Sequence, residues 1–288
     1  MSCPDCFKGA VHDHAEPKGT IETVYGRKTY IAGEPGTTTS KSAILYLPDA
    51  FSLKLVNNKL LADRYAAGTG CRVLIPDAVL HGGIDPSALP KMEVLMDPLE
   101  SWSISAILSK VWAFVSVLPS VVPFMIWGHP RNVYPDLLRY AREMRKDLPP
   151  GGKLGIAGFC WGGYGSTTLC TETAVEGGTE RLIDAQFNGH PSFLKAPDMV
   201  VDAIAKYKVP YSSAVAAADV MFNEKVALET EAAVRAKVGP PEENDYEFRI
   251  YKGCKHGFCV RATPDTANMD GYHAAAKQAV DWFNKYLN

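Results

Sequence analysis

The sequence predicts an α/β fold with a mostly parallel central sheet and helices on both faces. Short apolar runs of strand type alternate along the chain with longer segments of helical periodicity. Several of the apolar runs end in loops with polar residues, which is typical of open sheets that carry a site at the carboxyl edge. The chain has 288 residues, 47% of them hydrophobic, so it can build the core of a large α/β domain.

The alternation is read directly along the chain. Strands are expected at 21–31 (an edge pair), 42–47, 71–75, 153–157, 184–188, 209–215 and 246–251. Helices are expected at 57–67, 134–146, from about 162, around 226–234 and at 270–286. No internal repeat interrupts this order. We therefore predict a single domain over 21–288, preceded by a polar arm over 1–20.

The polar arm contains four residues of metal-ligand type. These are Cys3, Cys6, His12 and His14. Their spacing does not match that of zinc fingers, because five residues separate the second cysteine from the first histidine. We expect an arm without metal, and zinc binding remains the alternative.

Residues 97–130 are strongly apolar but are interrupted by Pro119 and Pro123. A membrane span requires about 20 uninterrupted apolar residues. We therefore interpret the segment as an apolar lid over the site, with membrane contact as the lesser alternative. On this interpretation the aromatic side chains of Trp112 and Phe114 bind the substrate.

Charge and cysteine content restrict the class of partner. The net charge is −2 and no long run of like charge occurs, which argues against nucleic acid and anionic membranes. A small-molecule substrate is the default expectation. No secretory signal is readable, so the seven cysteines are expected to be free thiols in the cytoplasm. Monomer and homodimer both remain open.

The most informative stretch is 153–166, in which a buried strand leads through small residues into a helix. Cys160 lies at the turn between Gly158 and Gly162, in the Gly-x-nucleophile-x-Gly pattern. A side chain at either glycine would collide with a neighbouring strand or helix. The alternatives are a buried structural cysteine in a glycine-rich turn and a dinucleotide-binding loop. The glycine spacing and the lack of a following acidic residue disfavour the dinucleotide-binding loop.

Two further reactive residues follow later strands. Asp219 comes after the strand at 209–215, and His256 follows the last strand. An imidazole can take the proton of a thiol, and a carboxylate can fix the imidazole tautomer. The order nucleophile, acid, histidine is that of the α/β-hydrolase fold. The sequence therefore predicts a Cys160–Asp219–His256 triad.

The motifs around these residues resemble the dienelactone hydrolase family, in particular its fungal branch. The resemblance rests on Gly-Phe-Cys-Trp-Gly-Gly, on Ala218-Asp219 and on His256-Gly257-Phe258. It implies hydrolysis of an ester or lactone through a cysteine acyl-enzyme, without cofactor or metal. It also implies that Asp49 contacts the resting thiol of Cys160. The backbone N–H groups of Ala50 and Trp161 would form the oxyanion hole.

The resemblance leaves the substrate open. Phe51 and His190 lie in loops beside the expected site, and we predict that both contact the substrate. Arg261 is the nearest candidate for the arginines that bind a substrate carboxylate in bacterial members. A non-hydrolytic binding or biosynthetic protein on the same fold is the alternative, although the intact triad favours the hydrolase.

Overall fold

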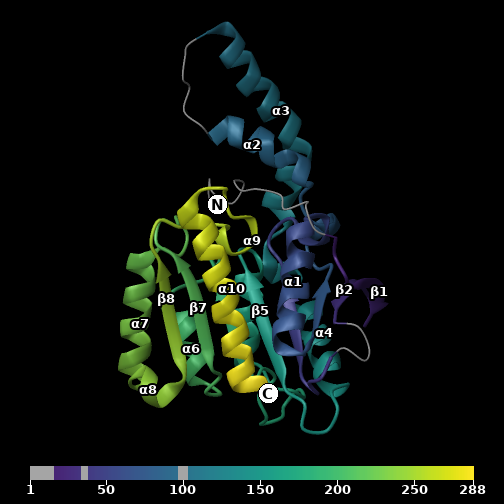
Figure 1. Ribbon diagram of the computed structural model, residues 1–288, viewed down its shortest axis with the longest axis vertical. Helices are drawn as coiled ribbons and strands as arrows, with labels where there is room; N and C mark the ends of the chain where they lie inside the picture. The colour runs from purple at the N-terminus through teal and green to yellow at the C-terminus, as the bar shows by residue number, and fades with distance from the viewer. Residues whose placement is uncertain (1–15, 34–37, 97–102) are drawn as a thin grey trace.

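The protein folds around one eight-stranded sheet, as a computed structural model shows (Figure 1). The structure describes residues 16–33, 38–96 and 103–288. The four metal-ligand residues of the arm lie outside the described residues, so zinc binding there is untested. The strands occur in the order β1-β2-β4-β3-β5-β6-β7-β8. Their bounds are β1 (Thr20–Val24), β2 (Arg27–Ala32), β3 (Ala43–Leu47), β4 (Arg72–Pro76), β5 (Leu154–Phe159), β6 (Ala185–Gly189), β7 (Tyr211–Ala216) and β8 (Tyr246–Tyr251).

The sheet is parallel except at one edge. β1 pairs with β2 and β2 with β4 in antiparallel fashion, and every later pairing is parallel. Every residue of β3, β5, β6 and β7 is buried. Strands covered on both faces need continuous apolar or small residues rather than alternation, which explains the apolar runs in the sequence. The predicted fold class is confirmed.

Helices cover both faces of this sheet. Their bounds are α1 (Val56–Thr69), α2 (Leu89–Met96), α3 (Ile104–Trp127), α4 (Tyr134–Lys146), α5 (Gly162–Thr168), α6 (Asp198–Ala205), α7 (Glu224–Val238), α8 (Pro241–Asn244), α9 (Phe258–Arg261) and α10 (Thr266–Leu287). Short 3-10 turns occur at Ser52–Lys54, Leu80–Gly82, Pro86–Ala88, Pro130–Asn132 and Leu169–Thr171. α1 and α10 pack on one face, whereas α4, α5 and α6 pack on the other with α7 beside α6 (Figure 1).

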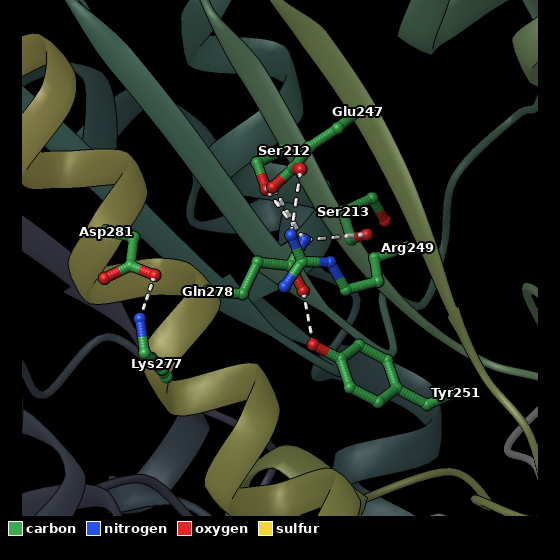
Figure 2. Close-up of polar contacts among 8 residues, drawn as sticks. All are labelled: Ser212, Ser213, Glu247, Arg249, Tyr251, Lys277, Gln278 and Asp281. Carbon is green, nitrogen blue, oxygen red and sulfur yellow. Dashed lines mark hydrogen bonds and ion pairs between the residues drawn. The ribbon is translucent and has the colours of Figure 1, made fainter.

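A buried polar cluster fixes α10 to the strands that lead to the candidate site. Gln278 of α10 donates from Nε2 to Ser212 Oγ on β7 and to Glu247 Oε1 on β8, both at 3.0 Å (Figure 2). Its Oε1 accepts a 2.7 Å hydrogen bond from Tyr251. Buried amides are stabilising only when their donors and acceptors are paired, so Gln278 fixes the registry of α10 on β7 and β8.

Most of the described part of the apolar segment is one helix, which the sequence did not predict. α3 is one helix of 24 residues that contains Pro119 and Pro123. A proline lacks the N–H donor and crowds the carbonyl four residues earlier, which usually kinks or ends a helix, but α3 continues through both. α3 and α2 pack against each other and project from the sheet body (Figure 1). By length and composition, Ile107–Trp127 is the one described helical stretch that could cross a membrane.

Candidate active site

Cys160 lies in a strained turn between β5 and α5. Its φ is +48°, a left-handed backbone conformation that a side chain rarely adopts. A Cβ on Gly158 would lie 2.3 Å from Ser166 Oγ, and one on Gly162 would lie 2.1 Å from the carbonyl oxygen of Leu47. Both distances are far inside van der Waals contact. The two glycines are therefore required by close packing, as the sequence pattern predicted.

His256 and Asp219 meet beyond the ends of β8 and β7. His256 Nδ1 and Asp219 Oδ2 are 2.8 Å apart, and both side chains are fully buried. The other carboxylate oxygen, Oδ1, accepts a 2.8 Å hydrogen bond from the backbone N–H of Met221. The carboxylate is thus held by two contacts. It favours the tautomer that protonates Nδ1, which leaves Nε2 as the basic atom of neutral His256.

The imidazole of His256 also lies within electrostatic range of Cys160. Burial by itself lowers the pKa of His256, but Asp219 and Cys160 raise it, and the pKa is held well above its ordinary value. A raised pKa favours the imidazolium, which would stabilise a thiolate beside it. Cys160 and His256 are each 3% exposed, so these groups lie beneath the protein surface.

Ser192 contacts the sulfur of Cys160, a role that the sequence did not predict. Its hydroxyl donates to Cys160 Sγ at 3.7 Å, and its backbone N–H donates to the carbonyl oxygen of Cys160 at 2.8 Å. Register explains the contact, because Gly189 at the end of β6 pairs with Phe159 at the end of β5. The loop after β6 therefore begins beside the turn between β5 and α5 that carries Cys160, called the elbow below. Nothing in a single sequence shows this pairing.

His190 packs behind His256 and is not on a surface. The two rings are 4.8 Å apart between centroids and meet at 78°. His190 is fully buried. Burial and the charges of His256 and Arg261 lower its pKa well below the ordinary value, so the ring is neutral. The position behind His256 makes His190 a neighbour of the catalytic base, and its predicted contact with the substrate stays a prediction.

Asp49 and Arg261, which were expected to act separately, form one buried ion pair. Arg261 Nε donates to Asp49 Oδ2 at 2.8 Å. The Oδ1 atom accepts from the Phe51 N–H at 3.1 Å and from Asn58 Nδ2 at 3.0 Å. Burial raises the pKa of Asp49, Arg261 opposes this, and the nearby charge of Cys160 adds to it. Arg261 is 1% exposed, and its charge balances that of Asp49 through the Nε contact.

The loop after β3 approaches the elbow closely. Gly162 N–H donates to the carbonyl oxygen of Pro48 at 3.1 Å, which holds this loop against the start of α5. Ala50 and Trp161, the expected oxyanion-hole residues, are both buried in this region. Phe51 is also buried, with the Arg261 guanidinium 5.1 Å from its ring centroid. Phe51 thus packs against the ion pair, and its predicted contact with the substrate stays a prediction.

The structure does not bring Trp112 and Phe114 to this cluster. Trp112 is 72% exposed and Phe114 is 54% exposed, both on the projecting helix α3. The lid interpretation assumed that apolar side chains turn inward. The side of α3 that packs inward carries other residues, including Ala113, Val117 and Phe124, which are buried.

Comparison with known proteins identifies the family. The model of the dienelactone hydrolase family matches residues 28–287. The chain belongs to this family. Among its relatives, the hydrolase pyvD of Aspergillus violaceofuscus is 27% identical over 98% of this chain and 96% of that protein. Dienlactone hydrolase 1 of Gibberella moniliformis is 26% identical over 98% of this chain and 93% of that protein.

Solved structures agree on the fold. A putative dienelactone hydrolase from Klebsiella pneumoniae aligns with a TM-score of 0.59 at 16% identity, over 93% of this chain and 98% of that one. Esterase 2 of Thermogutta terrifontis aligns with a TM-score of 0.57 at 13% identity, over 95% of this chain and 96% of that one. The α/β-hydrolase fold and the resemblance to the dienelactone hydrolase family are confirmed.

Among the described residues, no group of three or more His, Cys, Asp and Glu side chains is placed to hold a metal ion.

Proposed function

We propose that the protein is a cysteine-dependent hydrolase of small esters or lactones. The observation that carries the proposal is the 2.8 Å contact between His256 and Asp219 beside a cysteine held at φ +48° on the strand-to-helix elbow. Such an arrangement gives a thiol a nearby base and gives the base a fixed orientation. Retention of all three groups favours a hydrolase over a binding or biosynthetic protein on this fold.

In the first half-reaction, His256 holds the proton of Cys160 and the sulfur attacks the substrate carbonyl carbon. The C=O electron pair moves to oxygen, and the N–H groups of Ala50 and Trp161 are proposed to stabilise the resulting oxyanion. The C–O bond to the leaving group then breaks, and His256 returns the proton to the departing alkoxide. A thioester on Cys160 remains. With a lactone, the alcohol stays attached to the acyl chain.

In the second half-reaction, water hydrolyses the thioester. His256 Nε2 accepts a proton from water as its oxygen attacks the thioester carbonyl. Collapse of the tetrahedral intermediate breaks the C–S bond, releases the acid and returns a proton to sulfur. Asp219 stays ionised throughout and stabilises the imidazolium. No cofactor is required for these steps.

The buried ion pair supports an uncharged acyl group. Arg261, the candidate partner for a substrate carboxylate, already donates to Asp49. A substrate carboxylate would bring a second negative charge to a buried guanidinium whose charge Asp49 already balances. We therefore place neutral esters and lactones ahead of dienelactone-like acids as substrates. As a separate proposal, we place the protein in the cytoplasm.

Intact-mass spectrometry tests the mechanism. The purified protein is mixed with a panel of activated esters and lactones, and each reaction is quenched in acid within seconds. The mass of the intact protein is then measured. We expect one added acyl mass, located on Cys160 by peptide mapping. Cys160→Ala, which fits the same elbow, should give neither the adduct nor turnover.

Two results would contradict the proposal. Turnover retained in Cys160→Ala would exclude the sulfur as nucleophile. A wild-type protein that binds these compounds but neither acylates nor hydrolyses any of them would indicate the binding or biosynthetic alternative. Circular dichroism of the alanine variant serves as the folding control.

A further inference from the structure

The projecting helix α3 exposes an apolar face along its whole length. Placed on a helical wheel, that face is about 160° wide and contains no polar side chain. Six of its members, each at least 40% exposed, are Ile104, Leu108, Val111, Val115, Val122 and Met125. The opposite side packs inward through Ala113, Val117 and Phe124. α3 is therefore attached to the protein by one side and faces solvent with an uninterrupted apolar surface.

The size of this surface favours a binding partner. A half-cylinder with the length of α3, about 36 Å, has an area on the order of 500 Å². This is near the upper end of the largest apolar patch on a typical monomer, about 300–600 Å². α3 has a single charged residue, Lys110, whose Nζ lies 3.5 Å from the carbonyl oxygen of Leu95. Charge thus does little to keep this face in water.

We propose that the exposed face of α3 docks on a lipid bilayer. The acyl region of a bilayer can bury an apolar helix face of this width while the other side of the helix stays on the protein. Trp112 and Trp127 are 72% and 58% exposed, and tryptophan is enriched where headgroups meet acyl chains. Within α3 itself Lys110 is the one charged residue, so the attraction is to hydrocarbon and not to anionic headgroups.

A second copy of the chain fits this face less well. Pairing two such faces would bury on the order of 1,000 Å² in total, below the roughly 1,600 Å² of a standard stable interface. One partner helix also covers a narrow seam, whereas this face is about 160° wide. A bilayer covers the whole width. Self-association is therefore an outcome that the experiment must be able to detect.

The position of α3 connects the docking surface to the elbow. Gly128 directly follows the helix, and its carbonyl oxygen accepts a 2.6 Å hydrogen bond from Trp161 Nε1. Trp161 is the residue after Cys160. Docking would thus hold the elbow close to the bilayer, where apolar esters are concentrated, and this last step rests on the proposed hydrolase function.

Vesicle flotation tests the proposal without any ester present. The full chain is mixed with phosphatidylcholine vesicles and floated through a density gradient. We expect the wild type to float with the vesicles and to do so equally well, within about twofold, when phosphatidylserine is included or salt is raised. The double variant Leu108→Glu/Val115→Glu should lower the partition coefficient at least tenfold, because it removes two apolar side chains that the bilayer would bury.

Ser109→Glu is the matched control, because it adds the same kind of charge to the same helix outside the apolar face. It should float like the wild type. A wild type that stays in the soluble fraction overturns the proposal, as does an equal loss in Ser109→Glu. A soluble wild-type dimer that the double variant converts to a monomer, as seen by light scattering, would assign the face to a second copy instead. Thermal unfolding confirms that all variants fold.

Discussion

Arg261 and Asp49 form a fully buried ion pair between α9 and the loop after β3, with Nε and Oδ2 2.8 Å apart. The two residues are 212 positions apart in the sequence. Asp49 lies near enough to Cys160 for the two charges to interact. Burial raises the pKa of Asp49 and the guanidinium opposes this, so Arg261 favours the ionised carboxylate beside the nucleophile.

Arg261→Met should destabilise the protein strongly. It removes one partner of a buried pair and leaves the Asp49 carboxylate without its main compensating charge. Loss of one partner of such pairs costs about 3–5 kcal/mol of unfolding free energy. Urea unfolding measures this cost. Adding Asp49→Asn to Arg261→Met should recover part of the loss, and a double variant as unstable as the sum of the single variants would contradict the pairing.

Trp112→Ala and Phe114→Ala should have little effect on turnover in the absence of lipid. Both side chains are more than half exposed, and surface substitutions usually change free energies by less than about 0.5 kcal/mol. We expect kcat/KM to change less than about twofold on acetyl esters and on bulky apolar esters alike. A loss confined to bulky esters would instead support the lid interpretation and would place these side chains over the acyl pocket during turnover.

Ser192→Ala should slow the reaction of Cys160 with iodoacetamide at neutral pH. The hydroxyl donates to Sγ at 3.7 Å, and hydrogen bonds to charged groups are worth up to about 1.5–3 kcal/mol at ideal geometry. Because this contact is long, we expect a decrease of about tenfold or less, with a shift of the alkylation profile to higher pH. Ser192→Thr keeps the hydroxyl and should retain the wild-type profile. Identical profiles in all three proteins would show that the hydroxyl does not stabilise the thiolate.

The sequence was sufficient to predict the parallel sheet and the order of the reactive residues along the chain. Buried parallel strands require apolar runs, and the glycines around Cys160 are imposed by contacts as short as 2.1 Å, so both leave local signals. Asp219 and His256 were found because residues at the carboxyl ends of parallel strands meet at one edge. These inferences depend only on position along the chain.

The contacts that the sequence missed are long-range. Ser192 reaches Cys160 through the register of β6 on β5, and His190 reaches His256 through the same loop. Arg261 was expected at the site, but its partner could not be identified without the fold. The sequence did not predict that α3 is one helix, because prolines within it disfavour a helix locally while tertiary contacts can outweigh that cost.

The stability of the protein should depend on pH through His256. Burial lowers the pKa of this group, but Asp219 and Cys160 outweigh burial and hold the folded-state pKa well above the ordinary value. Such a group contributes stability that is fully present below its unfolded pKa, about 6.5, and is lost as pH rises through the folded pKa. We therefore expect the difference in unfolding free energy between wild type and His256→Gln to shrink at alkaline pH. A difference that grows with pH would show that His256 is neutral in the folded protein.

Asp49→Asn should make the resting thiol of Cys160 more reactive while turnover falls. The negative charge of Asp49 opposes formation of a thiolate nearby, and the variant removes this charge with little change in shape. A less protonated thiol is alkylated faster, so the rate with iodoacetamide in the substrate-free protein should rise several-fold. Turnover should fall because a neutral amide accepts from Arg261 more weakly than a carboxylate does, which disturbs the loop that carries Ala50.

Asp77→Asn provides the comparison, because Asp77 is an acid of a neighbouring loop whose Oδ1 accepts a 2.8 Å hydrogen bond from Ser52. This substitution should leave the alkylation rate of Cys160 unchanged. If Cys160 is alkylated at the wild-type rate in both Asp49→Asn and Asp77→Asn, then Asp49 serves only as the ion-pair partner of Arg261. Faster alkylation in Asp49→Asn alone would show that Asp49 keeps the cysteine protonated between turnovers, which limits its oxidation when no substrate is present.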